Sequence, residues 1–302
     1  MENRKYLAMN KNALSWARQK SEKIIPLKLE KLLCFWLLFL SADIIAQCPI
    51  SVSATAQPPN VCGLSGTVTL TGQILGGSAL DYFWEPGGLV NNPNSLTTTA
   101  TVNGPTTFTF TARTMTTNNL ILNGDFESGN SGFTSDFNYV APGPAFLAGG
   151  VYTVLTSPSI VSGSFPPCDD HTSGAGNMLL VNASNNAGAD VWCQTISVNP
   201  NSDYLFEAFV GTVGIIPVAM NLTINGVQIG STFNAGSLLC DWQQFTQTWS
   251  ANGATTATIC LSNQNGSFLG PVFALDDISL IEICRETAQV QATVRDAKIA
   301  YQ

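Results

Sequence analysis

Short runs of alternating apolar and polar residues recur along the chain, separated by clusters of Gly, Pro, Asn, Asp and Ser. Examples are GTVTLTGQI (66–74), TTFTFTAR (106–113), YLFEAFVG (204–211) and TATICLSN (256–263). A period of two is typical of β-strands with one buried face. The Asn-Gly pair in INGVQ (224–228) favours a tight hairpin turn. The pattern predicts an all-β protein.

The N-terminal segment has the composition of an export signal. Met1–Glu30 is rich in Lys and Arg, and the apolar run LLCFWLLFL (32–40) follows. This run is shorter than the roughly 20 residues that span a bilayer. With small Ala46 before the expected cleavage point, residues 1–46 are predicted to be a signal peptide. An uncleaved N-terminal anchor is the alternative. Cleavage predicts a protein that is secreted, extracellular or at the cell surface, with no transmembrane span after leader removal.

The charge of the remaining chain excludes some partners. The leader holds eight of the 12 Lys and Arg residues and four of the 20 Asp and Glu residues. Four basic and 16 acidic residues remain, a net charge of −12. Binding to phosphate depends on neutralisation by Lys and Arg, so we expect no nucleic-acid partner. Divalent cations and neutral ligands stay open.

The cysteines predict disulfides. Of the eight Cys residues, Cys34 lies in the leader, and no Cys-x-x-Cys pair occurs among the seven that remain. In an exported chain these residues are disulfide candidates rather than metal thiolates. A local bridge between Cys48 and Cys62 is expected, and the other pairings stay open. The candidates are Cys48, Cys62, Cys168, Cys193, Cys240, Cys260 and Cys284.

Residues 47–115 are predicted to form a first domain. Cys62 comes early, Trp84 lies in the strand DYFWEP, and the late alternating strand TTFTFTA (106–112) closes the unit. This order is that of an immunoglobulin-like sandwich. Phe108 and Phe110 stand where an antibody domain has its second Cys. The stretch resembles the immunoglobulin/PKD-like repeats of large secreted bacterial surface proteins, which implies a spacer.

Residues 118–284 are predicted to form a β-sandwich jelly roll. Several blocks occur in order: LILNGDFESGNSGF (120–133), DHTSGAGNMLLVNAS (170–184), the strands around VWCQTISV (191–198), and FALDDISL (273–280). An opening Asn-Gly-x-Phe-Glu and a closing apolar-Asp-x-apolar strand are similar to CenC-like carbohydrate-binding modules of the galactose-binding-like superfamily. The version with Trp-Cys-Gln resembles modules in exported multidomain proteins of Bacteroidetes-type bacteria.

This resemblance implies a structural Ca²⁺ where the first and last strands meet. Carried over by motif, the Glu is Glu127 and the closing Asp is Asp276, with backbone carbonyls near Asp125 and Asn177 completing the shell. Ca²⁺ takes roughly six to eight hard oxygen ligands. It would also offset repulsion between carboxylates, because residues 114–284 contain no Lys or Arg. Turn capping or solvation of the two acids is the alternative.

One departure from the family concerns the third strand. Many relatives carry an acid just before its Gly-Asn pair, where this chain has Gly174 and Ala175, so Asp169 or Asp170 is an alternative ligand. The side chains of Asp125 and Asp277 are expected to face outward, because adjacent strand residues point to opposite faces.

Aromatic and amide side chains are the candidates for glycan contact. In YLFEAFVG the alternation places Leu205, Glu207 and Phe209 on the face opposite Tyr204, Phe206, Ala208 and Val210. Burial in the core is the alternative for each aromatic residue. The predicted ligand-binding residues are Phe209, Glu207, Trp192 and Trp242.

Catalysis is not expected. The single His, His171, is interpreted as a loop residue, and no Gly-x-Ser-x-Gly or His-Glu-x-x-His motif occurs. Glu207 with Asp241 is the one carboxylate pair considered for glycosidase chemistry, and no signature supports it.

The sequence therefore predicts an immunoglobulin-like sandwich followed by a jelly roll. Residues 285–302 are expected to be a tail or the start of a truncated further domain. The predicted function is non-catalytic carbohydrate binding with a structural calcium site. An adhesin or structural stalk without sugar binding, and an accessory part of a carbohydrate-active hydrolase, are the alternatives. The expected partners are a glycan or polysaccharide and a cell-surface assembly.

Overall fold

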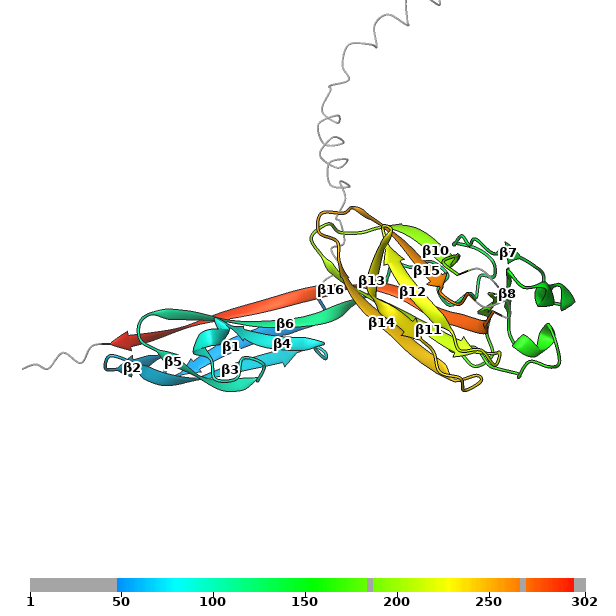
Figure 1. The fold of residues 1–302 in the computed structure, drawn as a ribbon. Helices are drawn as coiled ribbons and strands as arrows, with labels where there is room; N and C mark the ends of the chain where they lie inside the picture. Colours follow the sequence, from blue (N-terminus) through cyan, green and yellow to red (C-terminus); the bar gives the residue numbers. More distant parts are fainter. Residues whose placement is uncertain (1–47, 184–186, 267–269, 296–302) are drawn as a thin grey trace, which may run out of the picture. The chain divides into compact units, whose positions relative to one another are not determined.

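The structure, a computed structural model, describes residues 48–183, 187–266 and 270–295 (Figure 1). The predicted signal peptide and the last seven residues, 296–302, lie outside the described residues. Within those ranges the regular elements are β-strands, apart from short 3-10 helices at Gly87–Leu89, Pro144–Ala148 and Pro158–Ile160. The all-β prediction is confirmed.

A small sandwich is built mainly from the first third of the described chain. Strands β1 (Ser51–Gln57), β3 (Gly66–Leu75) and β5 (Thr97–Val102) form an antiparallel sheet. Opposite it, β4 (Asp81–Glu85) pairs with β6 (Thr106–Asn119). The expected alternation is present, and the inward residues form a core that contains Val68, Leu70, Trp84, Phe108 and Phe110.

The larger sandwich consists of two facing sheets. One has the order β10 (Asp190–Ser197), β15 (Thr256–Asn263), β12 (Ala219–Ile224) and β13 (Val227–Asn234). The other has the order β14 (Trp242–Ser250), β11 (Asp203–Thr212), β16 (Val272–Arg295), β9 (Met178–Asn182), β8 (Val151–Leu155) and β7 (Asn138–Tyr139). Trp192 and Ile259 from the first sheet pack with Phe206, Leu179 and Leu280 from the second in one core.

Strand β16 belongs to both sandwiches. Its first part pairs with β11 and β9, and its second part pairs with β6, from Ile281 opposite Asn119 to Ala292 opposite Thr106. Ala292 is buried in the small core, and the short strand β2 (Asn60–Cys62) pairs in parallel with the end of β16. Figure 1 shows β16 as one continuous arrow.

The long strand changes the expected boundaries. Residues 285–295, expected to belong to a tail, are strand and complete the small core. Strand β6 likewise passes the expected domain end at residue 115 and continues to Asn119. The reason is pairing at long sequence distance, which local patterns do not encode. A separate immunoglobulin-like domain stays a prediction, because the small sandwich is closed by a strand from the far end of the chain.

Three disulfides link segments that are far apart in the sequence. They are Cys48–Cys284, Cys168–Cys240 and Cys193–Cys260. The expected bridge between Cys48 and Cys62 is wrong: Cys62 is free and exposed on β2. Cys48 instead meets β16, which comes back to the start of the small sandwich. Among the described residues, no helix is both long and apolar enough to cross a membrane.

Candidate functional site

A loop of eight residues, Asp170–Asn177, covers part of the exposed face of β11 and β16, and buried Asp276 holds its first residues. Asp276 lies in β16 opposite Phe209 of β11 and is fully buried. The N–H groups of His171 and Thr172 donate to its Oδ2 over 2.8 and 3.2 Å. Burial raises the pKa of Asp276 to about 6, and the N–H groups of Asp277 and His171 only partly oppose it. Burial of this carboxylate in its ionised form is thus unfavourable, and its hydrogen bonds fix the start of the loop.

The middle of the same loop is organised by Asp170. Its carboxylate accepts hydrogen bonds from the N–H groups of Ser173 and Gly176, both over 2.7 Å. Burial alone would raise the pKa of Asp170, but these N–H groups together outweigh it and hold the pKa below its ordinary value. Asp170 therefore stays ionised and closes the loop on itself.

The end of the loop contacts the opening segment of the larger sandwich. Glu127 Oε1 accepts a hydrogen bond from the N–H of Asn177 over 2.7 Å. A Cβ atom on Gly176 would lie 1.9 Å from Glu127 Oε1 and 3.0 Å from Asp170 Oδ2. A larger residue at position 176 would displace the Glu127 carboxylate from this arrangement. Glu127, Asp170 and Asp276 are thus connected through one short loop.

The opening segment itself docks on a bulge in β16. Glu207 pairs with Ser279 and Phe209 pairs with Asp276, so Asp277 and Ile278 both lie opposite Ala208. Asp277 takes a φ of +47°. The bulge exposes the backbone of Ile278, whose N–H donates to the carbonyl of Gly124 over 2.9 Å. The predicted meeting of the opening and closing motifs is present in this contact.

The bulge also turns Asp277 toward the loop, where an outward side chain was expected. Strand parity fails at this position because the bulge inserts a residue in a left-handed conformation. Asp277 Oδ2 lies 2.6 Å from Nδ1 of His171, and Oδ1 accepts a hydrogen bond from the hydroxyl of Thr172 over 2.7 Å.

His171 is held on three sides. Its ring stacks on Phe209 with a centroid distance of 3.6 Å, and Trp242 meets it edge-on at 5.9 Å. The indole of Trp242 donates to the carbonyl of Asp169 over 3.1 Å, and the Cys168–Cys240 disulfide lies next to both in sequence. The imidazole therefore has a fixed orientation, with Asp277 at Nδ1.

These groups border a groove of about 480 Å³ on the exposed face of β11 and β16. Glu207 lines it and accepts a hydrogen bond from the side-chain amide of Gln244 over 2.5 Å. Phe209, Asp125, His171, Asp277, Asn123 and Ser279 are among the other lining residues. The groove presents carboxylate, amide and hydroxyl groups from four separate parts of the sequence.

The predicted ligand-binding residues divide into two groups. The parity prediction for β11 is confirmed, because Tyr204, Phe206, Ala208 and Val210 are buried while Leu205, Glu207 and Phe209 are partly exposed. Glu207 and Phe209 line the groove. Trp242 supports His171 from beside the groove. Trp192 is wrong as a contact residue, because it is fully buried in the main core.

Sequence reasoning missed the roles of His171 and Asp277. The position of His171 in a loop is as predicted, but nothing local to Cys168–Thr172 indicates that the loop folds over β11. The one available signal was the adjacent pair Asp276-Asp277 within an apolar strand. Such a pair can mark a bulge that interrupts the strand alternation. Both acidic side chains can then contact the same loop.

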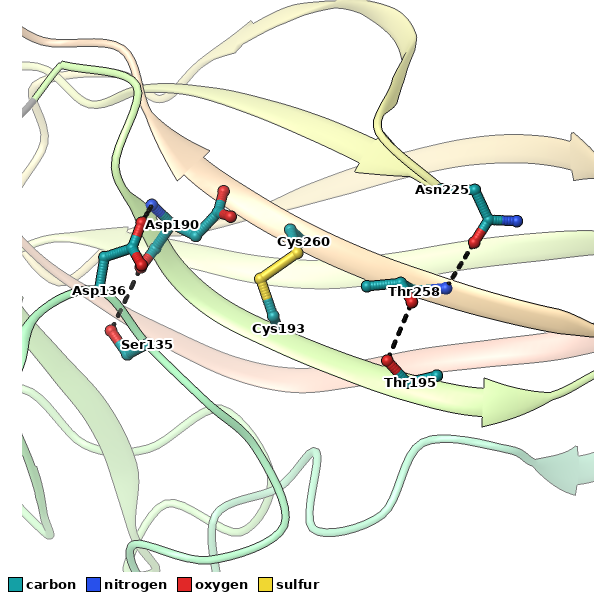
Figure 2. The surroundings of a disulfide bond; sticks show 8 residues. All are labelled: Ser135, Asp136, Asp190, Cys193, Thr195, Asn225, Thr258 and Cys260. Atoms are coloured by element: carbon teal, nitrogen blue, oxygen red, sulfur yellow. Dashed lines mark hydrogen bonds between the residues drawn. A yellow bond between two sulfur atoms is a disulfide. The ribbon is translucent and has the colours of Figure 1, made fainter.

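A second cavity, of about 570 Å³, lies beside the Cys193–Cys260 disulfide on the other sheet. Figure 2 shows Asp190 near this disulfide and Asp136 next to Asp190. Burial raises the pKa of Asp190, with a smaller contribution from the charge of Asp136. Among the described residues, Asp190, Cys193 and Cys260 are the one trio of acidic, His or Cys side chains whose ligating atoms all lie within 4.8 Å of one another. The two sulfurs are bonded to each other, so this trio is not a metal centre.

No protein-family model matches the chain, and no curated protein matches it. Solved structures that resemble it include the CBM22-1 xylan-binding domain from Paenibacillus barcinonensis Xyn10C, at 14% identity over 52% of this chain and 90% of that domain, with a TM-score of 0.36. TmCBM61 in complex with beta-1,4-galactotriose matches at 12% identity over 55% and 99%, with a TM-score of 0.39. A Family 16 Carbohydrate Binding Module-2 matches at 16% identity over 54% and 100%, with a TM-score of 0.34.

The chain thus has a distant structural similarity to carbohydrate-binding modules over about half of its length. At these TM-scores and identities the similarity shows no family membership, and the function proposed below rests on the residues of the groove.

Proposed function

We propose that this chain is a secreted or cell-surface, non-catalytic carbohydrate-binding protein, and that the groove over β11 and β16 is its binding site. The observation that carries the proposal is the groove itself: a cavity of about 480 Å³ with converging carboxylate, amide, hydroxyl and imidazole groups. Sugars are recognised through many hydroxyl hydrogen bonds, which these donors and acceptors supply. The three disulfides support an extracellular location.

Catalysis has weaker support. His171 is already paired with Asp277 and stacked on Phe209. Glu207 and Asp241 do not share the groove, because Asp241 is not among its lining residues. The geometry therefore favours a groove that holds a ligand over one that transforms it.

Binding can be tested by affinity electrophoresis against a panel of soluble polysaccharides. The variant His171→Ala removes a side chain of the groove wall, and we expect at least a fivefold loss of affinity. Thr248→Ala is the matched control, because Thr248 is exposed on β14 and lies outside the groove. Absence of retardation on every polysaccharide would contradict the proposal.

A structural stalk is the second candidate function. The observation that favours it is the covered ring of Phe209, whose face toward the loop is occupied by His171 at 3.6 Å. This stacking leaves less open aromatic surface for a sugar ring. A wild-type protein that binds no glycan while keeping its fold would support the stalk.

We also propose a structural Ca²⁺ held by Glu127, Asp170 and Asp276, with a carbonyl near Asn177. The residues fit the ion in ligand type, since all are hard oxygen donors. Glu127 accepts one described hydrogen bond, so it keeps capacity for a cation. The three carboxylates are not all within 4.8 Å of one another, so the ion would draw them closer together. When bound, it would neutralise charge that no Lys or Arg of residues 114–284 opposes.

Thermal unfolding in EDTA and in excess Ca²⁺ tests this site. A ligand that binds only the folded state raises the melting temperature, and a rise of about 4 °C or more is expected. Glu127→Gln should abolish most of this rise. Glu286→Gln, which removes the same charge from the second half of β16, should keep it. Equal melting temperatures of wild type in both conditions would contradict the calcium proposal and leave glycan binding open.

A further inference from the structure

The binding groove is lined by acids and by neither Lys nor Arg. Asp125, Glu207 and Asp277 all border it, and residues 114–284 contain no Lys or Arg. His171 is the one side chain of the lining that can carry a positive charge, and it contacts Asp277. The groove therefore carries an excess of negative charge at neutral pH.

The three carboxylates differ in how far the protein satisfies them. Both oxygens of Asp277 are engaged, one with His171 and one with Thr172. Glu207 has a neutral partner, Gln244, on Oε2 alone. Asp125 accepts a single long hydrogen bond, 3.4 Å, from the N–H of Glu127. Among the described residues, Glu207 and Asp125 thus keep acceptor capacity directed at whatever enters the groove.

The charge selects among glycan classes. A uronate or sulfated sugar would bring a second negative charge next to Glu207 and Asp125, and repulsion would oppose binding. A neutral sugar would take hydroxyl hydrogen bonds but would leave part of the carboxylate charge desolvated and uncompensated. A sugar with an ammonium group would supply both hydrogen-bond donors and the missing positive charge.

We infer that the groove binds amino sugars that carry a free ammonium group, such as glucosamine residues without their N-acetyl groups, with Glu207 and Asp125 as the ammonium acceptors. The inference rests on the proposed function and names the ligand class of the same site. Asp277 positions His171 as part of the groove wall and leaves the other two carboxylates for the ligand.

Calorimetric titration with paired oligosaccharides tests the inference. The probes are a glucosamine hexasaccharide, its fully N-acetylated counterpart, a neutral glucose hexasaccharide and a uronate oligomer, all at a pH that keeps the free amines protonated and at one fixed Ca²⁺ concentration. We expect the glucosamine oligomer to bind at least about tenfold more tightly than the N-acetylated one, and the uronate oligomer not to bind. Added salt should weaken the preference, because charge attraction is screened.

Variants distinguish binding by the groove carboxylates from attraction to the net negative charge of the protein. Glu207→Gln and Asp125→Asn should each reduce affinity for the glucosamine oligomer about fivefold or more, and should reduce any affinity for the N-acetylated oligomer by a smaller factor. Glu286→Gln, which removes one negative charge outside the groove, should have no effect. Hexalysine, a cation without a sugar, is the control ligand.

Each outcome decides a different point. If the N-acetylated or glucose oligomer binds as tightly as the glucosamine oligomer, the inference is overturned and the proposed function stands. If none of the four oligosaccharides binds, the inference is overturned, and electrophoresis on the polysaccharide panel decides the proposed function separately. If hexalysine binds equally well, or Glu286→Gln weakens binding as much as Glu207→Gln, the attraction comes from the charge of the whole protein and the inference is likewise overturned.

Discussion

At the scale of single residues, two adjacent acids have opposite surroundings. Asp276 is fully buried and accepts hydrogen bonds from three backbone N–H groups, those of His171, Thr172 and Asp277. Asp277 is partly exposed and borders the groove beside His171. The bulge at Asp277 and Ile278 explains how two neighbouring acids can both bind the loop Asp170–Asn177.

The raised pKa of Asp276 predicts a pH-dependent stability. The pKa in the folded state is about 6, above the ordinary 3.8, so between these values the folded state holds a proton that the unfolded state has lost. The free energy of unfolding should therefore fall as pH rises from about 4 to 6, by an amount on the order of 3 kcal/mol in EDTA. Added Ca²⁺ should reduce this fall, because a cation favours the ionised carboxylate.

The measurement is urea unfolding of wild type and Asp276→Asn at a series of pH values. The difference between the two proteins isolates Asp276 from the other acids, whose own titration acts in both. A difference that does not change with pH would show that Asp276 does not titrate in this range.

At the scale of elements, the opening segment and β16 form one unit. The N–H of Ile278 donates to the carbonyl of Gly124, and a Cβ on Gly124 would lie 2.0 Å from the carbonyl oxygen of Ile278. Because that oxygen belongs to the backbone, β16 and the opening segment cannot move apart without losing the hydrogen bond. Gly124, the glycine of the Asn-Gly-x-Phe-Glu motif, is thus required because the backbone of β16 comes so close to it. The motif alone does not show this reason.

The substitution Gly124→Ala should consequently be severe. We expect a loss of about 3 kcal/mol or more in the free energy of unfolding, since the backbone of β16 must shift. Gly88→Ala is the matched control, because no atom lies within 4 Å of the added Cβ, and a change within about 0.5 kcal/mol is expected. Chemical denaturation measures both. Similar stabilities for the two variants would mean that the opening segment is not packed on Ile278.

At the scale of the whole molecule, the sequence predicts what short patterns encode. The strands and the two faces of β11 follow from alternation, and the approach of the opening and closing motifs follows from the family resemblance. The position of the loop that carries His171 does not follow, because it depends on a bulge and on contacts to residues about 105 positions away.

Disulfide pairing was likewise beyond local reasoning. Cys48 and Cys62 are close in sequence, yet Cys48 pairs with Cys284, 236 residues away. The cause is the path of β16, which returns to the start of the small sandwich and pairs with β6. Trp192 shows the same limit, since alternation gave its face but not which face is covered by the opposite sheet.

Peptide mapping of the protein without reduction checks the pairing. Among the cysteines of the described residues, alkylation should label Cys62 alone, and three cross-linked peptide pairs should correspond to the three disulfides. Removing the longest link with Cys48→Ala and Cys284→Ala should lower the free energy of unfolding by about 3 kcal/mol. A peptide that joins Cys48 to Cys62 would contradict the fold at the small sandwich.

The Cys48–Cys284 bond encloses nearly all of the described chain in one covalent ring. A protease that cuts any surface turn within this ring leaves both fragments attached, so the nicked protein keeps its mass until the sulfur bridge is reduced. A single cleavage inside the ring therefore does not by itself release either fragment.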